Sequence, residues 1–306
     1  MLIAITGATG FVGRHLTSLF LRRGHRVRAL VRDLPRGNFL KAEGVDPVAG
    51  ALDDETALGR LCDGADAAVH LVGIILEWGS ATFTRVHVDG TRRVLEAARA
   101  AGVRKFVHMS ALGARPDARA TSYQRTKWQA EELVRSSGIS SAILRPSLIN
   151  GPESAPIRTL SRLHRWFPVI PIFGDGRFPT QPVWIGDIAL AFALACERSD
   201  IVGAFELGGP ATLTYEEFVR AIGRAVGHPR PLVHVPLSLV RWAARAFDPL
   251  GPAAPITSLQ LRMLIEGSST PSNAIETVFG IRPISFEEGL RRFLPQTTTK
   301  NQTRGQ

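Results

Sequence analysis

The stretch that decides the fold is the beginning of the chain, Met1-Leu-Ile-Ala-Ile-Thr6-Gly7-Ala-Thr-Gly10-Phe-Val-Gly13-Arg14. A short apolar strand over residues 2–6 runs into three glycines, and apolar residues then recur at helical spacing through residue 23. A strand, a glycine turn and a helix in this order form a cradle for phosphates, because the helix N-terminus presents free N–H groups to an anion. The spacing therefore predicts dinucleotide binding at this turn.

The bulk composition describes an ordinary globular protein of 306 residues, 44% hydrophobic and 21% charged. Its two cysteines, Cys62 and Cys196, lie far apart and match no metal or redox spacing, which predicts buried thiols in a reducing compartment. No stretch approaches the roughly 20 apolar residues of a membrane span, and we expect no leader peptide, because the first predicted strand begins at residue 2. We expect a cytoplasmic location, with peripheral attachment to the inner face of a membrane left open.

The formal net charge is +10, and most of the positive charge is arginine spread along the chain. A general preference for arginine explains it most simply, although attraction to anionic cofactors, lipid headgroups or an acidic partner remains open. The sequence holds no nucleic-acid recognition motif, so no nucleic-acid partner is expected. His164, His228 and His234 lack ligand-like spacing, so no metal is expected either.

The order of elements predicts an α/β fold, a doubly wound parallel sheet of the Rossmann type with a smaller, mainly helical C-terminal cap. The first half alternates expected strands at 2–6, 25–31, 45–48, 67–71, 105–110 and 141–145 with helices at 11–23, 54–61, 82–101 and 122–137. Proline and glycine then punctuate residues 151–182. Beyond them we expect strands at 182–185 and 204–207, and helices at 187–197, 214–226, 236–247, 257–266, 271–278 and 285–294.

Domain boundaries follow from this pattern. We expect residues 1–150 to form an NAD(P)-binding Rossmann domain, and residues 151–295 to form a cap for substrate or partner, with elements that return to the Rossmann core. The tail, 296–306, is expected to be disordered because it holds no apolar residue after residue 296. Asp187, at the start of an expected helix, is interpreted as its N-cap.

Three residues form a candidate catalytic set. Ser110 ends a predicted strand, and Tyr123 and Lys127 follow four residues apart, on one face of a predicted helix. An ammonium beside a phenol stabilises the ionised form, so we expect Lys127 to lower the pKa of Tyr123. The phenol would then exchange a proton with a substrate oxygen, which the serine would orient. Hydride transfer between a nicotinamide and a carbonyl requires such a set.

These motifs resemble those of the extended or atypical short-chain dehydrogenases/reductases. Residues 6–13 match the nucleotide loop of that family, Tyr123-x-x-x-Lys127 its active-site pair and Ser110 its serine. C-terminal segments at 182–188, 205–210 and 279–290 resemble the group that contains the Rossmann-type accessory subunit of respiratory complex I. That group is related to the NAD-dependent epimerases/dehydratases and to the NmrA-like proteins. The resemblance covers nearly the whole chain except the tail.

The resemblance also implies which residues hold the cofactor. Outside the catalytic set, the implied contacts are Gly7, Thr9, Gly10, Phe11, Val12, Gly13, Arg14, Leu52, Leu71, Val72, Gly73, His87 and Pro146, and Tyr123 and Lys127 also contribute. Two positions depart from the family pattern. His87 stands where an asparagine often helps to position the lysine. Ala51 stands where an aspartate often binds the adenine, and Asp53 or the backbone is expected to compensate.

The choice between the two nicotinamide dinucleotides depends on Arg32, which follows Gly13 by 19 residues at the end of the second predicted strand. NAD-binding folds usually place a carboxylate here, whereas a guanidinium pairs with a 2′-phosphate through charge-assisted hydrogen bonds. Arg14 is a second candidate for that phosphate, and Asp33 can face either way. We therefore expect NADP(H) rather than NAD(H).

Two stretches of the cap combine basic and aromatic residues, at 158–173 and 237–247. Either stretch is compatible with a membrane interface or a lipophilic substrate pocket. Packing of the cap against the Rossmann domain is the simpler interpretation of both.

Two functions fit the sequence. The first is an oxidoreductase that transfers a hydride between NADP(H) and a small lipophilic carbonyl or quinone-type substrate. The second is a non-catalytic NADP(H)-binding assembly, accessory or redox-sensing protein of a respiratory or quinone-related complex. The presence of all three of Ser110, Tyr123 and Lys127 favours the enzyme.

Overall fold

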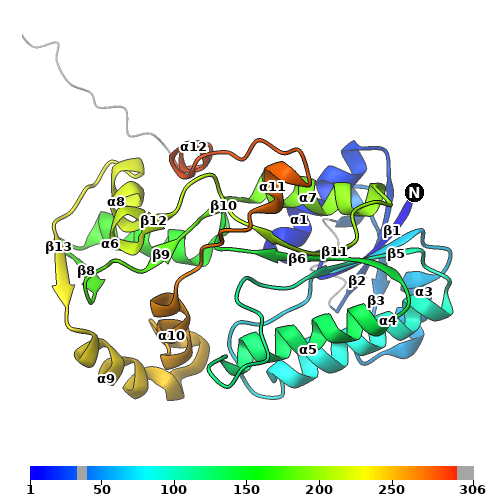
Figure 1. Ribbon diagram of the computed structural model, residues 1–306, viewed down its shortest axis with the longest axis horizontal. Coiled ribbons are helices and arrows are strands. Elements are labelled where there is room, and N and C mark those ends of the chain that lie inside the picture. The colour runs from blue at the N-terminus through cyan, green and yellow to red at the C-terminus, as the bar shows by residue number, and fades with distance from the viewer. Residues whose placement is uncertain (33–39, 295–306) are drawn as a thin grey trace, which may run out of the picture.

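A seven-stranded parallel sheet forms the centre of the molecule in the computed structural model, which describes residues 1–32 and 40–294 (Figure 1). Its strands lie in the order β11 (Gly203–Leu207), β6 (Ser140–Pro146), β5 (Lys105–Met109), β4 (Ala67–His70), β1 (Leu2–Thr6), β2 (Arg26–Val31) and β3 (Asp46–Ala49). The strand order reverses between β1 and β4. Parallel α/β sheets bind ligands at the carboxyl ends of the strands at such a point.

Helices cover both faces of this sheet (Figure 1). Alternate strand residues point to opposite faces, so Ile3 and Ile5 pack under α1 (Phe11–Arg22) and α7 (Ile185–Glu197). Ala4 packs on the other side, under α3 (Glu55–Cys62), α4 (Gly90–Ala100) and α5 (Ser122–Ser136). Both cysteines are free and buried in these layers, as predicted. The predicted doubly wound Rossmann fold is thereby confirmed.

The helix expected at 82–101 is interrupted by a π-helical segment, η1 (Thr84–Asp89), which leads directly into α4. A π-helix widens the turn and shifts the direction of its side chains, and such segments are frequent at functional sites. His87 lies within η1 and is buried.

The remaining chain forms the cap, at the end of the molecule away from the wide sheet (Figure 1). This part of the chain contains three two-stranded sheets. They pair β7 (Ile149–Asn150) with β10 (Val183–Trp184), β9 (Pro179–Thr180) with β12 (Leu213–Thr214), and β8 (Ile170–Phe173) with β13 (Leu232–Val235). Its helical segments are α6 (Ala155–Trp166), α8 (Tyr215–Ala225), α9 (Leu237–Phe247), η2 (Asp248–Ala253), α10 (Ser258–Glu266) and α12 (Phe286–Arg291). Helix α7, strand β11 and the short helix α11 (Ala274–Thr277) return to the Rossmann core.

The simpler interpretation of the two basic and aromatic stretches of the cap, that they pack against the Rossmann domain, is wrong. Their apolar inner faces pack within the cap. Ile157 and Leu160 of α6 join a cluster with α8, and Val240 and Ala244 of α9 join a cluster with Leu261 of α10. Both clusters belong to the cap itself. The outer faces of α6 and α9 are consequently left to solvent.

Asp187 is not an N-cap, contrary to the sequence interpretation. Helix α7 begins two residues earlier, with Trp184 at its N-cap, and Asp187 lies in the first turn. Its carboxylate accepts a hydrogen bond of 2.9 Å from the backbone N–H of Ile284, which ties α7 to the segment before α12. Burial raises the pKa of Asp187 to about 6. Within residues 1–32 and 40–294, no helix is both long and apolar enough to cross a membrane.

Candidate active site

The glycine turn between β1 and α1 has the geometry that the sequence predicts. Gly7 has a φ of 84° and its carbonyl accepts a 3.0 Å hydrogen bond from the N–H of Gly10. A Cβ on Gly13 would lie 2.1 Å from the Gly7 carbonyl oxygen, so only glycine fits there. Gly10 is the N-cap of α1 and offers no side chain to its first turn. The first-turn N–H groups, from Phe11 onward, therefore suit an external anion such as a pyrophosphate.

The loop after β4 connects this turn to helix α5. A Cβ on Gly7 would lie 3.2 Å from the backbone of Leu71 and Val72. A Cβ on Gly73 would lie 3.0 Å from Lys127 Nζ and 3.6 Å from His87 Nε2. The glycine turn thus adjoins the loop after β4, and that loop adjoins Lys127 and His87.

Helix α5 holds Tyr123 and Lys127 on one buried face. The N-terminus of the helix is stabilised by a reciprocal capping box between Thr121 and Gln124. The Tyr123 ring packs edge-on against His87, with ring centroids 5.5 Å apart, and against Phe83 at 5.8 Å. Lys127 Nζ donates a 3.0 Å hydrogen bond to the carbonyl of Met109, at the end of β5.

Burial dominates the ionisation of this pair. It raises the pKa of Tyr123 to about 12 and lowers the pKa of Lys127 to about 8, against the opposing charge of Glu131. The expectation that Lys127 lowers the pKa of the phenol is therefore wrong for this conformation, because the shift comes from burial, which disfavours the phenolate. Tyr123 is protonated at neutral pH, which is the form that donates a proton.

Ser110 is turned toward a buried ion pair. Its hydroxyl donates a 2.5 Å hydrogen bond to Glu131 Oε1, and Glu131 is fully buried. The guanidinium of Arg145 also binds Glu131, through hydrogen bonds of 2.8 and 2.6 Å. Sequence reasoning missed Glu131, although its place four residues after Lys127 puts it on the same helix face. The hydroxyl proton of Ser110 is thus directed away from a substrate oxygen.

Three buried histidines surround Lys127, and two of them were not foreseen. His70 and His108 stack at 5.5 Å on neighbouring strands β4 and β5. His87 bridges Thr126 of α5, at 2.9 Å, and the backbone N–H of Ile74, at 3.1 Å. Burial and then the charge of Lys127 lower the pKa of His70 and of His87 to about 3. All three imidazoles are consequently neutral at pH 7, since the same causes lower the pKa of His108.

Other residues that the sequence predicts as cofactor contacts lie far from Tyr123 and Lys127 along the chain, and their surroundings differ. Arg32 is exposed just beyond β2, and Asp33 lies outside the described residues. The Arg14 Nε donates a 3.1 Å hydrogen bond to the carbonyl of Thr9, at the glycine turn. Leu52 packs against Gly90, where a Cβ would lie 2.8 Å from its Cδ1. Asp53, expected to compensate for Ala51, is instead paired with Arg85 at 2.8 Å.

Two further features frame the site. Pro146, an implied cofactor contact, is buried at the end of β6. The cap reaches the site through Glu266 of α10, whose carboxylate accepts a 3.0 Å hydrogen bond from Gln124 in the first turn of α5. The carboxylate also pairs with Arg115, in the loop that leads from β5 to α5.

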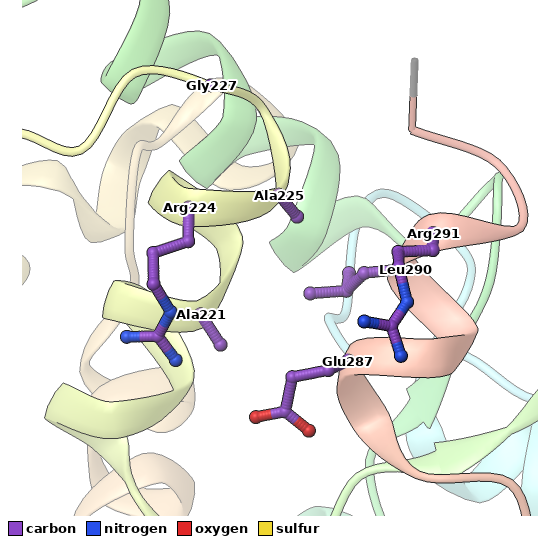
Figure 2. A pocket seen from close by; sticks show the side chains of 7 residues that line it. All are labelled: Ala221, Arg224, Ala225, Gly227, Glu287, Leu290 and Arg291. Carbon is purple, nitrogen blue, oxygen red and sulfur yellow. The ribbon is translucent and has the colours of Figure 1, made fainter. Parts of the chain in front are cut away.

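Figure 2 shows a separate pocket between α8 and α12, lined by residues that include Arg224, Glu287 and Arg291. None of its lining residues comes from the glycine turn or α5. Among the described residues, no group of three or more His, Cys, Asp or Glu side chains could hold a metal ion.

Relatives of known function include both reductases and a respiratory subunit. The ceramide reductase of Caulobacter vibrioides is 33% identical over 278 residues, covering 89% of this chain and 86% of the relative. A 4-hydroxy-2-methyl-3-oxo-4-farnesyl-3,4-dihydroquinoline-1-oxide ketoreductase of Stigmatella aurantiaca is 27% identical over 300 residues, covering 88% and 87%. The mouse mitochondrial NADH dehydrogenase [ubiquinone] 1 alpha subcomplex subunit 9 is 28% identical over 273 residues, covering 83% and 68%.

A solved structure shows the same fold. The UDP-glucuronic acid 4-epimerase of Bacillus cereus, in complex with UDP-glucuronic acid and NAD, superposes with a TM-score of 0.75 at 19% identity, covering 96% of this chain and 98% of that one. A sequence model of the NAD dependent epimerase/dehydratase family matches residues 3–208. The chain therefore belongs to the NAD dependent epimerase/dehydratase family of extended short-chain dehydrogenases/reductases, as its motifs predicted.

Proposed function

We propose that the protein is an NADP(H)-dependent reductase of a small lipophilic carbonyl or quinone-type compound. The observation that carries this proposal is the buried, protonated Tyr123, which lies one helical turn from Lys127 and packs against His87. A protonated phenol at this place suits reduction, because the carbonyl oxygen must gain a proton as the carbon gains a hydride.

The residues of the chain divide the work as follows. The nicotinamide cofactor, when bound, supplies the hydride. The first-turn N–H groups of α1 would hold its pyrophosphate, and Lys127 would donate hydrogen bonds to ribose hydroxyls. Tyr123 would give its proton to the substrate oxygen. Ser110 can orient that oxygen only after it exchanges its hydrogen bond to Glu131. His87 holds the loop after β4 against α5 and so keeps Gly73 next to Lys127.

The preference for NADP(H) rests on Arg32, exposed at the end of β2, and on Arg14 at the glycine turn. Replacement of Arg32 by alanine should weaken NADPH binding about tenfold or more, the value of charge-assisted hydrogen bonds to a phosphate. NADH binding should change less than about twofold by the same reasoning. Titration of both cofactors into wild type, Arg32→Ala and the exposed control Arg99→Ala checks this. Equal losses for both cofactors would contradict the assignment.

The substrate class rests on two relatives. One is named for ceramide and the other for a farnesyl-bearing ketone. Oxidation of NADPH should be followed with long-chain ketones, sphingoid ketones and quinones, beside water-soluble ketones and UDP-sugars. The proposal expects turnover that favours the lipophilic set. Tight NADPH binding without turnover of any carbonyl or quinone would contradict it.

The second candidate is a non-catalytic NADP(H)-binding accessory or redox-sensing protein. The observation in its favour is the 28% identity to a complex I subunit, together with Lys127 and Ser110 being engaged by Met109 and Glu131. This candidate predicts NADPH binding that stabilises the fold, no oxidation by any carbonyl or quinone, and retention of a protein complex on purification.

A further inference from the structure

The far end of the cap exposes large apolar side chains of a kind that folded proteins usually bury. Trp166 is 81% exposed and Trp242 is 69% exposed. Phe167, Val169, Val233 and Leu239 are each between 44% and 55% exposed. Together these six residues, which we call the cap-end surface, come from α6, β13, α9 and the segment before β8. Exposed apolar groups that gather in this way usually mark an interaction site.

The six residues are joined by the pairing of β8 with β13. Pro171 of β8 is the register partner of Val233, and both are exposed. Phe167 and Val169 lead into β8, and α9 follows β13 directly. Figure 1 shows α6, β8, β13 and α9 gathered at the end of the molecule farthest from the wide sheet. The pairing therefore brings two distant parts of the sequence, which carry the six residues, to one end of the molecule.

Positive charge accompanies this surface. Residues 154–174 and 228–247, which supply it, contain six arginines and no aspartate or glutamate. Arg158, Arg162 and Arg165 lie on the exposed face of α6 that ends at Trp166, since they are spaced four and three residues apart. On α9, Arg241 and Arg245 flank the stripe of Leu239 and Trp242. Within the described part of the chain, none of these five guanidinium groups forms a salt bridge.

Helix α9 shows the pattern most clearly. Its inner side buries Val240 and Ala244, which is enough to fix the helix on the cap. A solvated outer side would ordinarily be polar, yet it carries leucine, tryptophan and arginine. Tryptophan and leucine insert at the boundary between headgroups and acyl chains, and arginine pairs with the phosphates above them.

We propose that the cap-end surface docks the protein on a lipid bilayer that contains anionic headgroups. The charge complementarity selects this occupant: a protein partner or a second copy of the chain would have to bring acidic groups to five unpaired arginines, whereas an anionic leaflet presents them everywhere. Docking holds the cap against the leaflet in a fixed orientation. This inference does not depend on whether the chain reduces a substrate.

Co-sedimentation of the full chain with vesicles tests the proposal. The vesicles contain phosphatidylcholine alone or phosphatidylcholine with phosphatidylglycerol. We expect binding to the anionic vesicles, and weaker binding at high salt because the charges are exposed. Trp166→Ala combined with Trp242→Ala should lower partitioning about tenfold or more. Arg162→Glu and Arg165→Glu should each lower it at least about fivefold, the contribution of one basic residue at such a surface.

Matched controls exploit exposed residues elsewhere. Val202→Ser removes an apolar group that is 54% exposed, and Arg99→Glu reverses a charge on α4. Both controls should bind as wild type does, and circular dichroism should show that every variant is folded. Absence of binding to anionic vesicles, or equal loss in patch and control variants, would overturn the proposal. Dimers in sedimentation velocity that the tryptophan variants abolish, without vesicle binding, would also overturn it and assign the surface to a second copy.

Discussion

Burial, and not the neighbouring ammonium, shifts the pKa of Tyr123. The four-residue spacing of Tyr123 and Lys127 correctly placed both on one helix face, but spacing says nothing about how much water reaches them. Lys127 Nζ is also drawn to the carbonyl of Met109, a contact between α5 and β5 that only the folded chain reveals. The result is a protonated phenol, which fits the reductive direction of the proposed reaction.

The lowered pKa of Lys127 gives a pH dependence to cofactor binding. Because its pKa is about 8, the ammonium is lost as pH rises through about 8, and the hydrogen bonds that we propose it makes to the cofactor would weaken. NADPH affinity should fall up to about tenfold across this range. Titration from about pH 6 to about pH 10 measures it, with Lys127→Arg as the control that stays charged. A wild-type affinity that is flat through this range would show that Lys127 does not contact the cofactor.

Other contacts of the site could not be predicted from the sequence. The stacking of His70 and His108 depends on the register of β4 with β5, and the bond from Ser110 to Glu131 depends on which way one hydroxyl turns. Neither follows from spacing along one segment. Only the position of Glu131 could have been predicted, because it continues the four-residue spacing of Tyr123 and Lys127 on one helix face.

At the scale of elements, the glycine turn is the part that sequence predicted best. Gly13 touches the Gly7 carbonyl so closely that an added methyl group has no space. Gly13→Ala should therefore cost about 2 kcal/mol or more of folding free energy and weaken dinucleotide binding. Chemical denaturation and cofactor titration measure the two effects.

Gly59→Ala is the matched control, because a Cβ there meets nothing within 4 Å and the residue lies within helix α3. It should stabilise the protein by about 0.5–1 kcal/mol, through higher helix propensity. Equal effects of the two substitutions would contradict the close packing of α1 on the turn.

The strands of the wide sheet were predicted to within about two residues, because apolar runs between turn residues are a strong signal. Helix α6 was missed. Its Pro156 lies in the first turn of the helix, where proline is tolerated. In the sequence, however, this proline belongs to the proline- and glycine-rich stretch 151–182, which favours loops. The π-helical segment η1 could not be predicted either, because its pattern of apolar and polar residues matches that of an ordinary α-helix.

At the scale of the whole molecule, long-range contacts hold the cap and core together, and Asp187 makes one of them. Its pKa of about 6 in the folded state exceeds the ordinary value of 3.8. Between about pH 4 and pH 6 the folded protein thus holds a proton that the unfolded chain has lost, so stability contributed by this group falls as pH rises through that window.

Asp187→Asn should remove this pH dependence and stabilise the protein by about 1–3 kcal/mol at pH 7, because the amide oxygen can still accept from Ile284. Thermal unfolding between about pH 4 and pH 8 measures the change, with the exposed Asp63→Asn as control. A stability that falls at pH 7 in Asp187→Asn would mean that the charge itself is needed, through Arg292.

The position of the cap could not be read from the sequence, because it depends on contacts such as that between Glu266 and Gln124, which are 142 residues apart. These contacts bring the cap beside Tyr123 while leaving its far end exposed. The site and the cap-end surface thus occupy different parts of one molecule.

The central claim is that the phenol of Tyr123 donates the proton in an NADP(H)-dependent reduction. Its most direct test is single-turnover oxidation of bound NADPH with lipophilic carbonyls and quinones, in wild type, Tyr123→Phe and Tyr215→Phe. Tyr215 is the other tyrosine of the chain, equally buried but in the cap. We expect loss of about 100-fold or more in Tyr123→Phe alone, the size of a general acid's contribution. Oxidation that survives in Tyr123→Phe, or is absent from wild type with NADPH bound, would contradict the claim.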